Sequence, residues 1–432
     1  MQSSPDVISR FSAAAATPTR VRFSLIAILL VTIFVAYLDR ANISVLVAND
    51  EFLQEMGIAG RPASIGLLLS AFLFTYGISN VVLSPLGDFL GPRKAMCISV
   101  VLWIIAMTMG GIATTFAAMM ATRVLLGAGE GIHYPLQSVF VKKWFPPAER
   151  GRANSVWLTG QSLASAAAVP FFAFTILTFG WRSSFFICAG LGLIPLYLLW
   201  FHVTDTPRQN PKVNELELRH IEVELPDETK AGAARESIWQ SAKTFIGSYE
   251  YWLIVIYDIC HSMVFWGLAS WIPSYLKAAR GFSWQQMGWI ASLPFILEMI
   301  AKVAGGLLAD RWGKNALICF ISMLGSALSI YFGVTVENAY LAALLISMGV
   351  GMIGLGSPSM WAVTQRIVPR ASIGTASGLL NGTATWFGSL SPTIIGICIA
   401  LSGGSYAGGL YSLVATTVIG MLTALLLMQR KL

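Results

Sequence analysis

The stretch from Gly306 to Lys314 reads Gly-Leu-Leu-Ala-Asp-Arg-Trp-Gly-Lys and lies between two long apolar runs. An earlier stretch, Ser84 to Lys94, reads Ser-Pro-Leu-Gly-Asp-Phe-Leu-Gly-Pro-Arg-Lys and also separates two apolar runs. In each copy a glycine follows the aspartate by three residues, and a basic residue comes soon after that glycine. Two related copies that begin 222 residues apart indicate a duplicated chain with two similar halves.

The composition around these stretches is far more apolar than that of a soluble protein. Of the 432 residues, 56% are hydrophobic and 11% are charged, and the mean hydropathy is +0.69. Soluble domains carry about 25% charged residues, so an ordinary soluble enzyme is excluded, as are disordered, collagen-like and disulfide-rich chains. The five cysteines each lie alone within an apolar run, and their spacing fits neither a metal site nor a disulfide framework.

Apolar runs of about 18 residues or more are long enough to cross a bilayer as helices. Twelve such runs occur, six before and six after a polar connection at 204–250. The sequence therefore predicts an all-α membrane protein with twelve transmembrane helices in two six-helix halves. The predicted helices cover 23–48, 64–85, 95–113, 116–139, 153–176, 183–203, 251–277, 285–307, 315–335, 338–362, 373–400 and 405–428.

The Lys and Arg residues of the loops indicate which loops lie on the same side of the membrane. One side receives 21 of them, from segments that include 1–22, 204–250 and 429–432, and the other side receives 4. Cytoplasmic loops carry an excess of Lys and Arg, so we expect both ends of the chain and the connection in the cytoplasm. The two halves then cover 23–203 and 251–428. Because the net charge of +7 is spread over these loops, it does not indicate nucleic-acid binding.

Twelve spans, a long central connection and the repeated pattern Gly-x-x-x-Asp-Arg-x-Gly-Lys/Arg resemble the major facilitator superfamily over nearly the whole chain. The second copy matches fully, whereas the first has Ser84 at the leading glycine and Phe89 after the aspartate. We expect the glycines to permit close approach and tight turns, and the aspartates to accept bonds from helix N-terminal amides. The loop-motif positions are Asp88, Gly91, Arg93, Gly306, Asp310, Arg311, Gly313 and Lys314.

Three further motifs resemble one branch of that superfamily, the anion:cation symporter family. They are Tyr-Leu-Asp-Arg-Ala-Asn-Ile-Ser at 37–44, Arg-Val-Leu-Leu-Gly-Ala-Gly-Glu at 123–130 followed by Pro135, and Trp-Phe-Pro-Pro-Ala-Glu-Arg-Gly at 144–151. Members of that family are mostly proton-coupled carriers of organic anions, with sugar-acid and sialin-type carriers among them. The resemblance thus implies a substrate class that composition alone does not reveal.

Ionisable residues inside the spans are few, and each costs about 2.5–3.5 kcal/mol or more near the bilayer centre. Asp39 and Arg40 lie in the first span, and Arg123 and Glu130 lie in the fourth. A separation of seven residues places Arg123 and Glu130 on one helix face, about 10.5 Å apart along the axis. Gly127 lies between them, and we expect it to leave room for a substrate or for a neighbouring helix.

The family resemblance implies that Asp39 and Glu130 carry proton coupling and that Arg40 and Arg123 bind the substrate. Arginine suits an anion site because its guanidinium stays charged and binds a carboxylate through two bonds. Carboxyl groups suit coupling because burial and a neighbouring arginine shift their protonation in opposite directions. We predict that Arg40 is the principal anchor and that Arg123 is shared between the substrate and Glu130.

Polar residues on other spans complete the predicted binding site, although single polar residues in membrane helices also commonly join neighbouring helices. The candidates are Tyr76, Gln161, Ser359, Trp361 and Asn381. Another five ionisable residues fall in spans without matching the family pattern, and their roles stay open. They are His133, Asp258, His261, Glu298 and Lys302, of which Glu298 and Lys302 have the spacing of an ion pair.

These features predict a secondary active transporter that imports an organic anion by proton symport and alternating access. A sugar acid such as a hexonate, hexarate or hexuronate is the first expectation. A carrier of an aromatic or short-chain carboxylate, or a non-transporting membrane sensor with the same fold, stays open. The chain has no P-loop and no His-x-x-x-His pair, so we do not expect an enzyme. We expect a monomer in a bacterial inner membrane, with a small organic anion and the lipid bilayer as partners and no cofactor besides the coupling protons.

The loop charges predict the side on which the 204–250 connection lies. A cysteine introduced at Glu228 should resist an impermeant thiol reagent in intact cells, because this segment belongs to the side with 21 basic residues. Labelling is compared on a background without the native cysteines, with lysed cells as the positive control. Ready labelling in intact cells would reverse the predicted topology.

Overall fold

The computed structural model describes residues 17–83, 86–222, 243, 245–369 and 372–430, and within these ranges the regular structure is helical, with no strand. The position tested at Glu228 and the motif residue Ser84 lie outside the described residues. Within the described ranges, eleven helical stretches are long and apolar enough to cross a membrane. The long helix that carries Arg123 and Glu130 makes the twelfth passage, so the predicted all-helical fold with twelve passages is confirmed.

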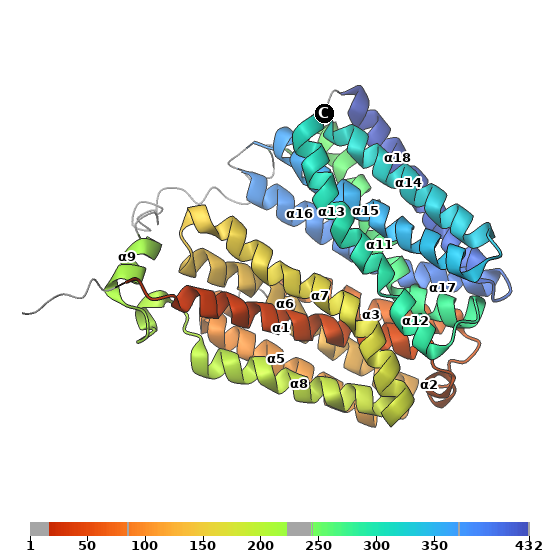
Figure 1. The fold of residues 1–432 in the computed structure, drawn as a ribbon, viewed down its shortest axis with the longest axis horizontal. Helices are drawn as coiled ribbons and strands as arrows, with labels where there is room; N and C mark the ends of the chain where they lie inside the picture. The colour runs from red at the N-terminus through yellow and green to blue at the C-terminus, as the bar shows by residue number, and fades with distance from the viewer. Residues whose placement is uncertain (1–16, 84–85, 223–242, 244, 370–371, 431–432) are drawn as a thin grey trace, which may run out of the picture.

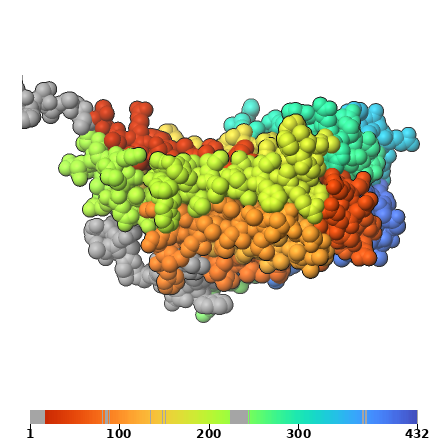
Figure 2. All heavy atoms as spheres, turned by 90° about the horizontal axis from the view of Figure 1, so that it is seen from below, coloured from red at the N-terminus to blue at the C-terminus, as the bar shows by residue number. Residues whose placement is uncertain are grey.

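The first half consists of six long helices and two short ones. The long helices are α1 (Val21–Leu46), α3 (Pro62–Val82), α5 (Pro92–Ile112), α6 (Phe116–Trp144), α7 (Pro147–Phe179) and α8 (Trp181–His202). The short helices are α2 (Asp50–Glu55) and α4 (Leu86–Leu90), and after α8 the connection forms η1 (Pro207–Gln209) and α9 (Glu215–Glu222). In the space-filling view, α5 and α8 cover the outer face of this half (Figure 2).

The second half repeats the six passages but breaks three of its helices. Its elements are α11 (Tyr249–Ser274) with the π-helical turn η2 (Tyr275–Ala279), α12 (Trp284–Ile290) with α13 (Leu293–Trp312), α14 (Asn315–Thr335), α15 (Ala339–Ile367), α16 (Ile373–Gly388) with α17 (Ser391–Leu401), and α18 (Tyr406–Gln429). Two of the breaks precede Pro294 and Pro392, which lie in the first turns of α13 and α17. Proline fits a first helical turn because its missing N–H has no helical partner there.

The two halves meet at one end of the molecule and diverge at the other, where α1 begins (Figure 1). We call the latter the termini end, because the first described residues and the end of α18 lie there. Hydrogen bonds between the halves join Ser274 to the carbonyl of Val47 at 3.1 Å and Ser292 to that of Ala166 at 2.6 Å. A third links the hydroxyls of Thr393 and Ser70 at 2.7 Å. The contact between the halves therefore lies away from the termini end.

Glycines allow the two halves to approach closely at the joined end. A Cβ atom added to Gly66 of α3 would overlap the carbonyl oxygen of Pro392 in α17. A Cβ atom added to Gly396 of α17 would in turn overlap the carbonyl oxygen of Pro62. Backbone cannot give way as a flexible side chain can, so larger residues at these two positions would push the halves apart.

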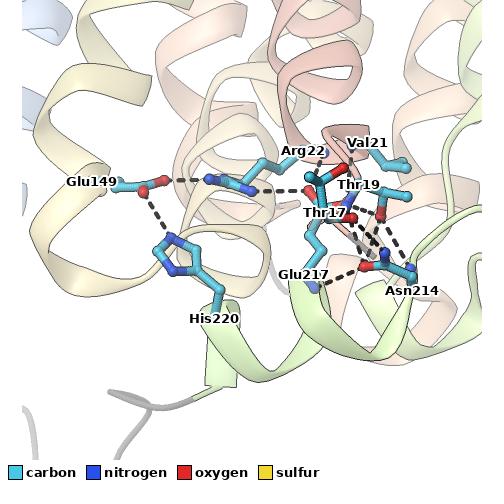
Figure 3. Close-up of polar contacts among 8 residues, drawn as sticks. All are labelled: Thr17, Thr19, Val21, Arg22, Glu149, Asn214, Glu217 and His220. Carbon is cyan, nitrogen blue, oxygen red and sulfur yellow. Dashed lines mark hydrogen bonds and ion pairs between the residues drawn. The ribbon is translucent and has the colours of Figure 1, made fainter. Parts of the chain in front are cut away.

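A buried carboxylate from the connection holds the start of α1. Glu217 of α9 is fully buried and accepts hydrogen bonds from the backbone N–H groups of Val21 and Arg22, each at 3.1 Å (Figure 3). Its carboxylate also accepts from the hydroxyl of Thr19 at 2.6 Å and from the guanidinium of Arg22 at 3.1 Å. The first N–H groups of a helix lack helical partners and attract a negative charge. Glu217 therefore satisfies the N-terminus of α1 across 196 residues of sequence.

Arg22 also connects this arrangement to the start of α7. Its guanidinium donates to Glu149 at 3.1 Å, and the other carboxylate oxygen of Glu149 lies 2.8 Å from Nε2 of His220 in α9 (Figure 3). Burial alone would raise the pKa of Glu149, but the hydrogen bonds from His220 and Arg22 outweigh it and hold this pKa below its usual value. These contacts therefore favour the folded state above the ordinary carboxyl range and weaken as the pH falls through the lowered pKa.

The burial of Glu217 predicts a large effect of its removal. Glu217→Ala should lower the free energy of unfolding by about 3–5 kcal/mol, because it leaves Nη1 of Arg22 and two helix amides without their partner. Thermal unfolding of the purified chain should show a lower Tm. Glu215→Ala is the matched control, because Glu215 lies exposed on the same helix. Equal Tm values for the two variants would contradict the stabilising role of Glu217.

Candidate functional site

Four charged side chains gather in the middle of the first half, from α1 and α6. Asp39 and Glu130 are fully buried, and Arg40 and Arg123 are 9% and 1% exposed. A Cβ atom at Gly127 would overlap the hydroxyl of Thr75 and the carbonyl of Phe72 in α3. Of the two expectations for Gly127, the structure thus shows the close approach of a neighbouring helix, which brings α6 against α3.

Glu130 forms its ion pair with Arg40, and not with the arginine on its own helix. Nε of Arg40 donates to Oε2 of Glu130 at 2.6 Å. The guanidinium of Arg40 also lies over the rings of Tyr37 and Tyr76, 4.2 and 4.4 Å from their centroids. Cation–π contacts of this kind strengthen where water is excluded. The spacing along α6 favoured Arg123 as the partner of Glu130, but the short contact crosses from α1 to α6.

Arg123 keeps hydrogen-bonding capacity that the described residues do not use. Its Nε and Nη2 atoms are buried and have no hydrogen-bond partner among those residues, and its guanidinium lies 5.2 Å from the ring centroid of Phe72. The nearby carboxylate of Asp39 is similar, because neither of its oxygens accepts a hydrogen bond from a nitrogen or hydroxyl group of the described residues. Unused donors on a buried arginine are costly, and an acceptor group placed beside Arg123 would remove that cost.

Arg40 and Arg123 both line a cavity of about 60 Å³ between the two halves. The first half supplies these cations together with Tyr37 and Phe72. The second half supplies a different wall, made of Phe265, Trp266, Ala269, Ser270 and Phe295. One wall therefore carries positive charge, and the facing wall is largely aromatic.

The remaining predicted binding residues lie at different distances from this cavity. Tyr76 contacts Arg40, as described above. Gln161 of α7 and Trp361 of α15 are partly buried, and Asn381 of α16 is exposed. Ser359 of α15 is fully buried, with its hydroxyl unpartnered among the described residues. None of these five residues is part of the cavity lining in this conformation.

The first loop motif is organised by an aspartate that the sequence analysis did not identify. Gly91 has φ +81°, and a Cβ atom there would approach the carboxylate of Asp205 to 2.8 Å. That carboxylate accepts the backbone N–H of Arg93 at 2.7 Å, in the first turn of α5. Asp88 lies in α4. Asp205, just after the end of α8, therefore binds an amide in the first turn of α5. The one feature of the sequence that could have indicated this role is the position of Asp205 just after the sixth apolar run.

The second loop motif has a simpler structure. Gly313 has φ +63° and ends α13 in the left-handed conformation, a role that glycine fills without strain. Its carbonyl accepts a hydrogen bond from Arg366 at 3.3 Å. The side chains of Asp310, Arg311 and Lys314 are exposed, and a Cβ atom at Gly306 would meet open space. Asp310 accepts no hydrogen bond from the described helix N-termini, unlike our expectation.

The sequence model of the Major Facilitator Superfamily matches residues 29–392. The chain belongs to the major facilitator superfamily. The predicted resemblance is therefore confirmed, and this assignment makes the chain a multi-pass membrane transport protein and not an enzyme.

Curated relatives within the superfamily align along most of the chain. A probable sulfoacetate transporter of Cupriavidus necator is 28% identical and covers 89% of both chains. A probable galactarate/D-glucarate transporter of Bacillus subtilis is 28% identical over 96% of this chain and 94% of its own. A D-galactonate transporter of Escherichia coli O6:H1 is 25% identical over 96% and 97%.

Solved structures of the superfamily share the fold. A bacterial homologue of the human lysosomal transporter Spinster, in an inward-facing and unoccupied conformation, superposes with a TM-score of 0.76 at 18% identity, covering 94% of this chain and 96% of that one. A D-xylose-proton symporter superposes with a TM-score of 0.70 at 17% identity, over 94% and 97%. The major facilitator fold is thus established by sequence and by structure.

Proposed function

We propose that this chain is a secondary transporter that moves a small organic anion together with protons by alternating access. The observation that carries the proposal is the pair of buried arginines, Arg40 and Arg123, on one wall of the cavity between the halves. A buried cation persists in a membrane helix when it has a functional partner. The relatives named above support the substrate class, because sulfoacetate, galactarate, glucarate and galactonate are all organic anions.

The substrate anion binds first to Arg123, whose Nε and Nη2 atoms have no other partner among the described residues. A carboxylate or sulfonate accepts two parallel N–H bonds from one guanidinium. Arg40 faces the same cavity but is held by Glu130 at 2.6 Å. Full binding therefore uses Arg40 only after its contact with Glu130 has weakened.

Protonation of Glu130 weakens its contact with Arg40. A neutral carboxyl binds a guanidinium far less strongly than a carboxylate does, so a proton on Glu130 releases Arg40 toward the substrate. Asp39 lies fully buried nearby, and among the described residues no nitrogen or hydroxyl group donates to it; the thiol of Cys188, a weak donor, is its neighbour. A buried carboxylate without a strong donor is costly, and a proton removes that cost. Asp39 and Glu130 thus link proton binding to anion binding.

Alternating access follows from the unequal contact between the halves. The two halves contact each other away from the termini end, and their helices diverge toward that end (Figure 1). An anion held by arginines of the first half also meets Ser270 and Trp266 of the second half. A ligand that contacts both walls favours the conformation in which they are closer, and rocking of the two halves about this site then exposes it to the other side.

Two substrate classes fit the site, and different observations favour them. The galactarate, galactonate and hexuronate carriers among the relatives favour a sugar acid. The cavity of about 60 Å³ favours a short carboxylate, and the aromatic second-half wall favours one with an apolar face. A thermal-shift screen of the purified chain against carboxylates and sulfonates, followed by flux into liposomes, separates these classes. Binding without flux would instead support a sensor that kept the fold.

The cellular setting is part of the same proposal. The side with 21 basic residues faces the cytoplasm of a bacterial inner membrane, which places both ends of the chain there. The open termini end in this structure is then the cytoplasmic end, and the conformation is inward-facing. The chain works as a monomer, with protons as the coupling ion.

Replacement of Glu130 tests the coupling step. Glu130→Gln should abolish proton-driven accumulation but leave anion exchange detectable, because glutamine fills the same space without accepting a proton. Uphill uptake and counterflow are measured side by side in liposomes. Asp39→Asn should show the same separation of the two activities.

Glu149→Gln is the control for loss of a carboxylate elsewhere in the first half, because Glu149 lies outside the cavity lining. Uphill uptake that is unchanged in both Glu130→Gln and Asp39→Asn would remove these residues from the coupling mechanism.

Replacement of the arginines tests the binding step. Truncating one partner of a buried charged contact costs about 2–5 kcal/mol, so Arg40→Ala and Arg123→Ala should each weaken anion binding by at least about thirtyfold. Arg40→Lys should also bind poorly, because an ammonium keeps the charge but loses the planar pair of bonds. Affinity is measured by calorimetry on the purified chain.

Arg182→Ala is the matched control, because Arg182 pairs with Glu55 on the surface at the joined end. Native affinity in folded Arg40→Ala and Arg123→Ala would place the anion site elsewhere in the chain.

A further inference from the structure

The second half contains a cluster of four ionisable side chains that the site described above does not use. Asp258 and His261 lie on α11, and Glu298 and Lys302 lie on α13. The side chains of Asp258, His261 and Glu298 are 7%, 17% and 8% exposed, and that of Lys302 is 41% exposed. Ionisable groups in membrane helices are costly, so a buried cluster of this kind requires a role.

The cluster lies next to the central cavity, on its termini side. Phe265 of α11 and Phe295 of α13 both line the cavity, and their ring centroids are 6.5 Å apart. Asp258 precedes Phe265 by seven residues, and Lys302 follows Phe295 by seven. Because the two helices run in opposite directions, Asp258 and Lys302 both lie about 10.5 Å along the helix axis from these phenylalanines, toward the termini end. The four side chains therefore form a layer between the cavity and that end.

Contacts within the cluster divide it into two pairs. Lys302 forms an ion pair with Glu298, one turn away on the same helix. Oδ1 of Asp258 lies 3.9 Å from Nδ1 of His261, which is longer than a hydrogen bond. Lys302 also acts electrostatically on His261, whose Nε2 atom is buried without a hydrogen-bond partner among the described residues. His261 thus connects the two pairs.

The fixed charges of the cluster do not balance. Two carboxylates face one ammonium, and the helices packed around α11 bring no further charge to this level. Helices α16, α17 and α18 contain no Asp, Glu, Lys, Arg or His, and α15 contains only Arg366, near its last turn. On α1, Arg40 belongs to the opposite cavity wall, and Asp39 lies buried within the first half. A buried net charge is costly, and one proton shared by Asp258 and His261 would neutralise the cluster.

We propose that Asp258 and His261 form a second proton-binding site, in the half opposite to Asp39 and Glu130, and that its proton moves in the same cycle. This inference rests on the proposed function for its link to transport. Helices α11 and α13 also carry contacts between the halves, since Ser274 and the adjoining Ser292 bond to the first half. Rocking of the halves therefore moves this pair relative to the first half. The proton binds from water at the joined end when that end opens, and it leaves to water at the termini end in the present state.

The first experiment needs no substrate. The full chain has four histidines, so carbon-13 labelling of histidine gives few signals, and His261→Asn identifies the signal of His261. We expect that signal to shift as the pH falls from about 8 to about 5, because Asp258 binds a proton 3.9 Å from the ring, and we expect Asp258→Asn to remove the shift. A His261 signal that stays constant over this range, or that responds identically in Asp258→Asn, would overturn the proposal.

The second experiment measures coupling with galactarate as the probe anion. Reversal potentials in liposomes give the number of protons moved per anion. We expect Asp258→Asn and His261→Asn to lower this number by about one, while Glu337→Gln, an exposed carboxylate in the same half, leaves it unchanged. A purely structural role would reduce the amount of folded protein without changing the ratio, and an unchanged ratio would contradict the proposal.

The two experiments separate this inference from the function on which it rests. Absence of any galactarate flux in the unaltered chain would count against the proposed substrate class, and the histidine signals would still decide whether the proton site exists. A His261 signal that reports proton binding at the pair, together with a coupling ratio unaffected by Asp258→Asn, would show a site that does not take part in transport, which would refute the link.

Discussion

The cost of placing charge inside a membrane is the constraint on which this structure depends. Arg40 and Glu130 lie on different helices and form an ion pair at 2.6 Å, and the rings of Tyr37 and Tyr76 cover the guanidinium. Neither charge would be tolerated alone at this depth. Their contact fixes α1 against α6, and the close approach permitted by Gly127 sets α6 against α3. The ion pair therefore links α1 to α6 and neutralises two of the buried charges of the first half.

The joined end of the two halves depends on a different property, the small size of the residues there. Gly66 and Gly396 face backbone carbonyls of the opposite half, and the hydrogen bonds between the halves are few. The hydrophobic effect does not favour helix association within lipid, so an interface of this kind is stabilised mainly by the close packing of small residues. An interface of this type is weak enough to open, which a transporter that alternates between two states requires.

The twelve passages, the two halves and the membership of a family were predictable, because each rests on local composition or on a short motif. The pairing of Glu130 with Arg40 was not, because the spacing of Arg123 and Glu130 along one helix says nothing about contacts between helices. The roles of Asp205 and Glu217 also escaped prediction. Each binds a helix start more than 100 residues away, and the local sequence around an acidic loop residue carries no sign of that partner. Helix breaks before Pro294 and Pro392 were hidden inside continuous apolar runs.

The charge balance of the central site gives a physical reason for the proposed coupling of an anion to a proton. Arg40 and Arg123 balance Asp39 and Glu130, so with all four ionised the site is neutral while it is empty. A bound carboxylate adds one negative charge in a setting where a net charge is costly. One proton on Glu130 or Asp39 restores neutrality and also frees a guanidinium for the substrate. Under the proposed function, the anion and the proton would therefore stabilise each other's binding without any direct contact, and an equal number of buried arginines and carboxylates is the simplest arrangement that would produce this coupling.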